Sequence, residues 1–263
     1  MPTITKITPQ KLAGRFNLFL DDKFAFGVSE STLVKYRLTK GMVLDQQAVS
    51  NVKAAQQQAE ANAMALTYLA AQQRTRHEVA EKLKAAQIPP AVIANTLAYL
   101  ADLHYLDDAQ YAQSFIHDAL NLGDKGPGVV TQKLIQRGLS DQVIQAAIAE
   151  VDADHWLPAA RRAAKKAANQ TTRELFFKRQ QKIRLALIKK GFSATVADAR
   201  LQELDLQADV DGEHERLVQE AQKQWRAKRK YTGFERRNRV KMALYRKGYD
   251  LDAIDAVLDE FDD

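Results

Sequence analysis

Three short stretches of the chain repeat one pattern, in which basic residues precede a glycine and a new segment follows. They read LIQRGLS from Leu134, LIKKGFS from Leu187 and LYRKGYD from Leu244. A glycine after a basic last turn is typical of a helix C-terminus, and the Ser or Asp two residues later can N-cap the next helix. A degenerate copy begins at Leu83, where Gln87 replaces the glycine.

The anchor leucines of these four copies are 51, 53 and 57 residues apart. Such a period indicates a tandem array of one supersecondary unit. A unit of roughly fifty residues has a small core and buries its remaining apolar surface by stacking on its neighbours. We therefore predict a mainly α-helical protein with four three-helix modules in an elongated array. The modules cover residues 51–106, 107–152, 153–207 and 208–263.

The first fifty residues differ from the repeats. Bulky apolar residues alternate with others in GRFNLFL and again in KFAFGV, and Asp21 and Asp22 stand between the two runs. Alternation with a period of two on both sides of a polar turn predicts a β-hairpin. Residues 1–50 are therefore expected to form a small β extension in front of the helical modules.

Hydroxyl and acidic residues mark several predicted helix starts. The T-x-x-E pattern of a capping box occurs at Thr75, Thr171 and Thr232. Asp107 and Asp108 could be a carboxylate pair for a metal, but no third ligand lies nearby at metal-site spacing. We predict instead that one of them N-caps the following helix and the other favours its dipole.

Several classes of protein are disfavoured by what the sequence lacks. It has no cysteine, its five histidines are scattered, and it contains no phosphate-binding glycine motif and no nucleophile elbow. We therefore expect neither an enzyme nor a bound metal or cofactor. The N-terminus does not resemble a secretory signal, and no apolar run reaches the length of a membrane span. A cytoplasmic protein without a membrane partner is expected.

The net charge of +6 is unevenly placed. Residues 1–152 contain 15 Lys/Arg and 15 Asp/Glu, whereas residues 153–263 contain 24 and 18. Two blocks, 161–191 and 223–247, each hold eleven basic residues and one acid. Blocks nearly free of acids favour binding to phosphates or to an acidic protein surface over a merely solvated face. The candidate binding residues are Arg161, Arg162, Lys165, Lys166, Lys178, Arg179, Lys182, Lys228, Arg229, Lys230, Arg236, Arg237, Arg239 and Lys241.

Three aromatic residues, Trp225, Tyr231 and Phe234, are interleaved with the second basic block. Aromatic side chains can stack on unpaired bases. At helical spacing, however, such residues are more often buried, so we predict that these three belong to the core.

The segment AYLADLHYLDDAQYAQSF, from Ala98, resembles the signature of the RecX family, the regulators of the RecA recombinase. The matching residues are Tyr105, Leu106, Asp107, Asp108, Tyr111 and Ala112, while His104 stands where glycine is usual. The opening helices, from Ala65 to Leu83, and the late KGYDLDAID are similar to the first and last modules of that family. RFNLFLDDKFAFGV is similar to the extension of members from Gram-positive bacteria, with Asp22 in place of a common turn glycine.

The resemblance covers nearly the whole chain and implies a non-enzymatic, monomeric protein. It would bind the RecA filament on single-stranded DNA, curb ATP hydrolysis and strand exchange, and contact single-stranded and also double-stranded DNA. The charge pattern alone leaves open a regulator that binds DNA through helix-turn-helix-like modules without RecA, although third helices such as DLDAIDAVLDEFDD are acidic. A nuclease would need clustered acids with a metal. The basic residues before the late glycines are where we expect function to lie.

Overall fold

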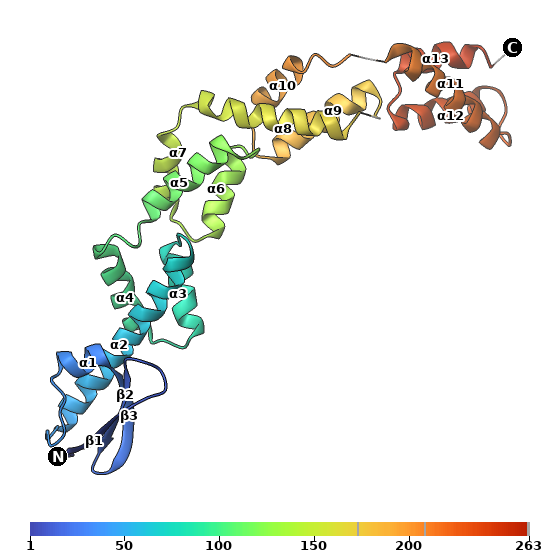
Figure 1. Cartoon of the computed structure of the whole chain (residues 1–263). Coiled ribbons are helices and arrows are strands. Elements are labelled where there is room, and N and C mark those ends of the chain that lie inside the picture. The colour runs from blue at the N-terminus through green and yellow to red at the C-terminus, as the bar shows by residue number, and fades with distance from the viewer. Residues whose placement is uncertain (173, 208, 262–263) are drawn as a thin grey trace. The chain divides into compact units, whose positions relative to one another are not determined.

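The computed structural model describes residues 1–172, 174–207 and 209–261. This part consists of a three-stranded sheet followed by thirteen α-helices and one short 3-10 helix (Figure 1). The predicted class, mainly α-helical with a small N-terminal β region, is confirmed. The elements are β1 (Ile4–Pro9), β2 (Arg15–Leu20), β3 (Lys23–Ser29), α1 (Glu30–Lys35), α2 (Gln46–Ala71), α3 (Arg76–Ala85), α4 (Pro90–Asp102), α5 (Asp108–Asn121), α6 (Pro127–Gln136), α7 (Asp141–Ala149), η1 (Ala153–Trp156), α8 (Leu157–Gln170), α9 (Phe176–Lys189), α10 (Ala194–Glu203), α11 (Val210–Ala227), α12 (Gly233–Lys247) and α13 (Leu251–Asp259).

The predicted hairpin is confirmed as β2 and β3, and β1 adds a third antiparallel strand beside β2. The hairpin turns at Asp21 and Asp22, whose φ angles are 48° and 63°. A two-residue turn with both φ angles positive matches the right-handed twist of the strands it joins. Aspartate tolerates this region better than most residues, so the turn forms without the usual glycine.

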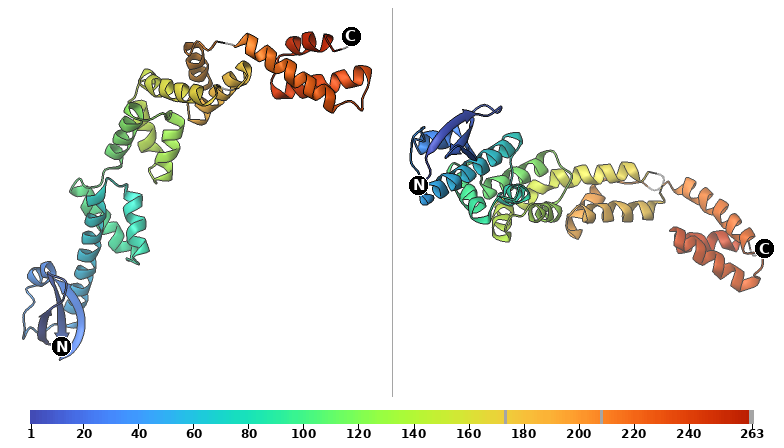
Figure 2. Two further views of the ribbon diagram at one scale, coloured as in Figure 1. Left: turned by 45° about the vertical axis from the view of Figure 1, so that its right-hand side comes forward. Right: turned by 90° about the horizontal axis from the view of Figure 1, so that it is seen from below.

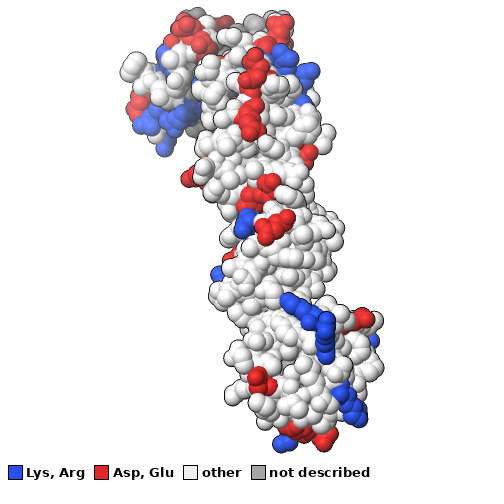
Figure 3. All heavy atoms as spheres, turned by 90° about the vertical axis from the view of Figure 1, so that its left-hand side faces the viewer, with Lys and Arg blue, Asp and Glu red and all other residues white. Residues whose placement is uncertain are grey.

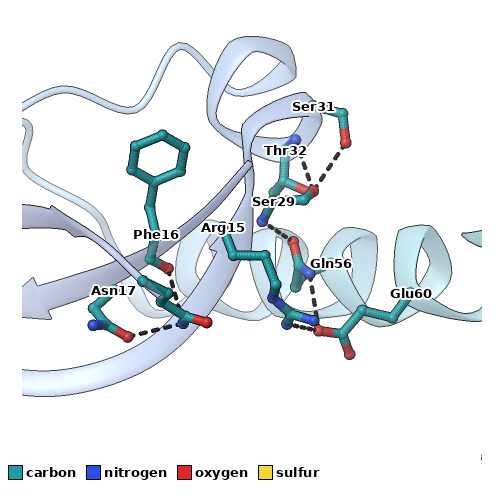
Figure 4. Close-up of polar contacts among 9 residues, drawn as sticks. Arg15, Phe16, Asn17, Ser29, Ser31, Thr32, Gln56 and Glu60 are labelled. Carbon is teal, nitrogen blue, oxygen red and sulfur yellow. Dashed lines mark hydrogen bonds and ion pairs between the residues drawn. The ribbon is translucent and has the colours of Figure 1, made fainter. Parts of the chain in front are cut away.

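Helix α2 is shared between the sheet and the first helical module. Its first half packs Val52 against Ile4, Leu18 and Val28 of the sheet. Figure 4 shows the polar contacts at this junction, where Arg15 of β2 pairs with Glu60 and the Gln56 amide oxygen accepts from the backbone N–H of Ser29 at 2.7 Å. The second half of α2 buries two alanines against α3 and α4. The β extension is thus joined to the first module by a continuous helix.

The chain forms two compact units, residues 1–114 with 134–147, and residues 115–133 with 148–263. In the first unit, beyond the sheet, Ala61 and Ala65 of α2 are buried with Val79 and Leu83 of α3 and Leu100 of α4. These residues are the apolar stripes of three successive helices. Their convergence on one core is what the helical periodicity predicts for a three-helix module.

The second unit contains two further three-helix cores (Figure 2). In one, α8 buries a face of six alanines against Ile183 and Leu187 of α9 and Ala197 of α10. Small side chains let helices approach closely, because interaxial distance depends on the residues at the contact. In the other, Leu217 of α11 and Leu244 of α12 are buried with a cluster of apolar residues from α13.

The helix starts follow the predictions only in part. Thr75 and Glu78 form the predicted capping box. The prediction at Thr171 is wrong, because α9 begins at Phe176 and the Thr171 hydroxyl instead donates to the Ala167 carbonyl, 2.8 Å away, at the end of α8. Thr232 does precede α12, but its side chain makes no cap, and the Glu235 carboxylate pairs with Arg239 instead of closing a capping box. In the part of the chain that the structure describes, no helix has the length and apolar character to cross a bilayer.

Candidate functional site

The corner glycines have the left-handed backbone that the sequence pattern predicts. The φ angles of Gly138, Gly191 and Gly248 are 81°, 88° and 95°, and Gln87 takes the same region at 60°. A residue without a Cβ enters this region at no steric cost, which explains a helix stop at each glycine. Each corner also packs against the helix module that precedes it, which the sequence did not indicate.

The first of these joints lies in the first unit. Gly138 packs against the ring and Cβ of His77, at the start of α3. The Thr75 hydroxyl donates to the Arg137 carbonyl at 2.7 Å, and the Arg137 guanidinium pairs with Glu78 at 2.8 Å. The end of α6 therefore meets the beginning of α3, so that a helix C-terminus lies beside a helix N-terminus of opposite partial charge.

The second joint lies in the second unit and brings backbone against backbone. The N–H of Gly126 donates to the Lys190 carbonyl at 2.7 Å, and that of Gly128 donates to the Gly191 carbonyl at 3.1 Å. A Cβ on Gly126 would lie 2.6 Å from the Gly191 oxygen. Lys190 pairs with Asp124, in the loop before α6. The loop GDKGPG is thus rich in glycine because the next module's corner lies directly on it.

The third joint has the same arrangement with a side chain in place of the loop. Gly248 lies on the aliphatic part of Lys178, near the start of α9, and the Lys178 ammonium reaches the Arg246 carbonyl at 3.5 Å. In all three joints the corner of one module therefore meets the N-terminus of the second helix of the module before it. We call these contacts the corner joints.

The corner joints use part of the basic residues that precede the glycines. Arg137 and Lys190 pair with acids of the preceding module, and Lys247 pairs with Glu220 of α11 at 2.5 Å. Lys189 and Arg246 are exposed, and their side chains have no hydrogen-bond or ion-pair partner among the described residues. Among the basic residues directly before the three glycines, Lys189 and Arg246 are thus the two whose side chains have no partner within the described residues.

The ion pair of the second joint makes stability depend on pH. Its hydrogen bond from Lys190 holds the pKa of Asp124 below the ordinary value of 3.8. A lowered pKa in the folded state stabilises the fold above the unfolded pKa, and this contribution is lost as the pH falls through the folded value. We expect Asp124→Asn to lower the free energy of unfolding by about 1 kcal/mol at pH 7.

The difference between Asp124→Asn and the wild type at pH 7 should shrink at a second, acidic pH that lies below the lowered pKa of Asp124, where the carboxylate is protonated. Urea unfolding followed by circular dichroism at both pH values measures it. Asp118→Asn is the matched control, because Asp118 is exposed on α5 nearby and has no partner among the described residues. An equal loss of stability at both pH values would contradict a role for the charged pair.

The predicted binding residues on α8 differ in how much the fold itself uses them. Arg162 donates to the carbonyls of Gly123, at 2.8 Å, and Leu120, and so closes the end of α5. Arg161 pairs with Glu203, and Lys166 pairs with Asp124 at 3.4 Å. Lys165 is exposed and has no partner in the described chain.

Most of the predicted residues on α9 and α12 also have partners within the chain. On α9, Lys182 pairs with Glu174 and Arg179 approaches the Ala168 carbonyl at 3.5 Å. On α12, Arg236 stacks on Trp225 with 4.4 Å between its guanidinium and the ring centre. The remaining α12 pairs are Arg237 with Asp259 at 2.6 Å, Arg239 with Glu235 at 2.9 Å, and Lys241 with Asp255.

The turn between α11 and α12 holds the least engaged cations. Arg229 is exposed without a partner in the described chain, and Lys230 lies only over the Tyr231 ring. Arg226, one helical turn earlier, is also exposed without a partner among the described residues, and the sequence argument missed it although it belongs to the same basic block. Lys228 is bound to the Gln224 amide at 2.7 Å. We call Arg226, Arg229 and Lys230 the basic corner.

Charge is mixed on one face of the molecule. On the face drawn in Figure 3, basic and acidic side chains form small separate groups within an uncharged surface. Such a distribution lacks the continuous single-sign field that steers polyanions. The face drawn in Figure 3 therefore carries no broad basic surface.

Of the three aromatic residues that we predicted to be in the core, Trp225 is confirmed there and Phe234 is not. Trp225 packs on the α11–α13 core beside Phe261. Tyr231 is half-buried under Arg239, 4.0 Å from its ring centre. Phe234 is 83% exposed, because it occupies the first turn of α12 on the face directed away from the core.

The first residue of the acidic pair at the start of α5 caps that helix, as predicted. The Asp107 carboxylate accepts from the backbone N–H groups of Ala109 and Gln110, which caps α5. Asp108 accepts from the N–H of Arg76 at 2.9 Å, at the start of α3. His104 takes a positive φ of 58° in the turn before them, where glycine would be usual. Within the described residues no group of three or more His, Asp or Glu could hold a metal ion.

Family models match four separate segments of this chain. They are the regulatory protein RecX N-terminal domain at residues 2–45 and the first, second and third RecX three-helix domains at residues 61–100, 107–148 and 211–258. A regulatory protein RecX of Lacticaseibacillus casei is 42% identical over 99% of this chain and 98% of its own. The chain belongs to the RecX family. A regulatory protein RecX of Limosilactobacillus reuteri is 37% identical over 100% of this chain and 99% of its own.

Solved RecX structures share the fold. A crystal structure of regulatory protein RecX has a TM-score of 0.63 and 34% identity, and covers 75% of this chain and 98% of its own. RecX from Lactobacillus salivarius has a TM-score of 0.53 and 33% identity, with 58% and 99% covered. The four family-model segments do not include residues 149–210, which contain α8, α9 and α10. These helices form a three-helix core of their own, so this chain has a module between the second and third family domains.

Proposed function

We propose that this protein binds the RecA filament on single-stranded DNA and restrains RecA's ATP hydrolysis and strand exchange. The observation that carries the proposal is similarity along the whole chain to proteins named regulatory protein RecX. Regulation by a protein of this family, with helical modules joined in series, is best explained by occupancy of the partner's surface rather than by catalysis.

The test is the DNA-dependent ATPase of RecA with this protein titrated into it at constant salt. We expect the rate of ATP hydrolysis to fall as the ratio of this protein to RecA rises. No change at stoichiometric ratios would contradict the proposal. Magnesium-dependent cleavage of the DNA in the same mixture would indicate a nuclease instead.

The basic corner is proposed to contact DNA phosphates within this complex. Within the described residues its three cations lack the ion pairs that hold most other predicted residues, so binding them to phosphate breaks no ion pair in that part of the chain. Of the candidate residues predicted from the sequence, Lys165, Arg229 and Lys230 meet this condition best. A cation that is already paired within the chain can bind a phosphate only by giving up its intramolecular partner.

Replacing Arg229 and Lys230 by glutamine is expected to flatten the salt dependence of single-stranded DNA binding. Each phosphate contact adds about 0.7 to the slope of log K against log salt, so the slope should fall by about 1.4. Fluorescence anisotropy of a labelled oligonucleotide at several salt concentrations measures this. Lys40→Gln with Lys84→Gln is the control, because it removes the same charge from exposed sites in the first unit. If both double variants gave the same slope, the proposal that the basic corner contacts DNA phosphates would be contradicted.

An independent helix-turn-helix regulator is less well supported. In such a protein the third helix of a module enters the major groove. Helix α13 carries Asp252, Asp255 and Asp259, and buries its apolar face in the module core. Carboxylates on the remaining face would repel DNA phosphates.

A further inference from the structure

Helices α9 and α12 carry exposed apolar side chains at equivalent positions. Gly191 and Gly248 are 57 residues apart, and the same offset relates Phe177 to Phe234, Leu185 to Met242, and Ile188 to Tyr245. The exposed fractions of these six residues are 60%, 83%, 60%, 41%, 38% and 51% in that order. Exposed apolar residues are common singly, but matching sets of three at one offset require an explanation.

Each set lies on one face of its helix. At about 100° per residue, the positions i, i+8 and i+11 fall within an arc of about 80°. The amides Gln181 and Asn238, at i+4, lie inside that arc and are exposed. The buried residues Leu187 and Leu244 belong to other faces, which build the module cores. The exposed sets are therefore outer surfaces and not incompletely covered core.

The two sets meet at the third corner joint. A groove of about 420 Å³ is lined by Phe177 and Gln181 of α9 together with Tyr245 and Leu251 from the end of α12 and the start of α13. Because Gly248 lies on Lys178, the end of one apolar face adjoins the beginning of the other. We call the six apolar residues and this groove the apolar band.

The band is confined to the last two modules. At the equivalent positions of the second module the chain has Asp124, Gln132 and Ile135, and only the last is apolar. The first module has Gln73, Glu81 and Lys84 at the corresponding places. A face needed for stacking modules would recur in all four, so this face serves something outside the chain.

We propose that the apolar band is the surface by which this protein holds RecA, contacting apolar side chains edged by carboxylates on successive filament subunits. This inference rests on the proposed function and assigns the surface that performs it. Arg246, which is free in the described chain, and Lys178 border the groove and would pair with the carboxylates. Leu185, Ile188 and Met242 neither stack as aromatic rings nor neutralise phosphates, so the band fits a protein better than a nucleic acid.

The repetition of the band favours a repetitive partner. Two equivalent faces, one on each module, match two equivalent sites on neighbouring subunits of a polymer. Joining two weak contacts makes the second intramolecular and raises the overall affinity well above that of either one. Loss of one face should therefore weaken binding strongly, and loss of both should reduce it further.

The experiment uses the full chain with glutamine replacing exposed apolar residues. One variant combines Phe177→Gln with Leu185→Gln, a second combines Met242→Gln with Tyr245→Gln, and a third carries all four changes. Affinity is measured for RecA filaments on oligo(dT) and, separately, for oligo(dT) alone. We expect each double variant to bind filaments about tenfold more weakly and the fourfold variant about a hundredfold. Binding to oligo(dT) alone should stay within about twofold.

The control replaces Tyr99 and Leu103 on and after α4, which are exposed to a similar degree outside the band, by glutamine. It should bind filaments like the wild type, and circular dichroism should show equal helix content for all variants.

Unchanged filament affinity of the fourfold variant would overturn the inference, as would a parallel loss of oligo(dT) binding, which would make the band a DNA surface. If the wild-type protein self-associates through the band, sedimentation will show it and the assignment fails. A wild-type protein that does not bind filaments would refute the proposed function itself.

Discussion

Replacement of Gly191 by alanine is expected to lower the free energy of unfolding of the second unit by about 3 kcal/mol or more. Two costs combine at this position. The φ angle of 88° is one that an alanine adopts only with strain, and an added Cβ would overlap the backbone nitrogen of Val129 and lie 3.1 Å from the Gly128 carbonyl carbon. Backbone atoms cannot move aside as a flexible side chain can, so the second corner joint must open.

Gly41→Ala separates these two costs. Gly41 has nearly the same φ angle, 89°, but nothing lies within 4 Å of the place where its Cβ would stand. That substitution should therefore cost only the backbone strain, about 1–2 kcal/mol. Urea unfolding followed by circular dichroism measures both variants. Equal losses would mean that the corner joint does not depend on close backbone approach.

Leu187→Ala is expected to destabilise the α8–α10 core by about 3 kcal/mol, within the usual range for a buried leucine. Leu187 is completely buried against the alanine face of α8. Alanine side chains cannot extend into the space that the leucine leaves, so the cavity should stay largely open and its full cost should be observed.

Leu185→Ala is the matched control in the same helix. Leu185 is 60% exposed, so the same chemical change there should alter the free energy of unfolding by less than about 0.5 kcal/mol. Urea unfolding of both variants compares the loss in the free energy of unfolding at a buried leucine with that at an exposed one. If the two losses were similar, the placement of α9 against α8 would be wrong, and with it the outward orientation of the apolar band.

The sequence was sufficient to predict local structure. Alternation around Asp21 predicts the hairpin, helical periodicity predicts the helices, and the glycine pattern predicts each corner. These features depend on interactions between residues close in the chain, which recur wherever the same residues occur. The Thr171 capping box failed because the same pattern also suits a helix end, where a threonine hydroxyl can donate to the carbonyl four residues earlier.

Which basic side chains have partners within the chain could not be predicted from local sequence. Arg162 looks identical in sequence to a solvent-exposed binding residue, yet it caps α5 from about forty residues away along the chain. Only the docking of one module on another brings its partners within reach. The same holds for Lys190 and Asp124, whereas the exposure of Phe234 follows from which face of α12 meets its core.

The corner joints bear on how such a chain can change in length. Each joint is head-to-tail, since it uses the corner of the later module and the second-helix N-terminus of the earlier one, and a module therefore carries one half of a joint at each end. Gene duplication that inserts a whole module supplies both halves at once and requires no new interface. The extra α8–α10 module in this chain is what such a duplication would leave. The number of modules in such a chain can thus change while the head-to-tail joint is kept.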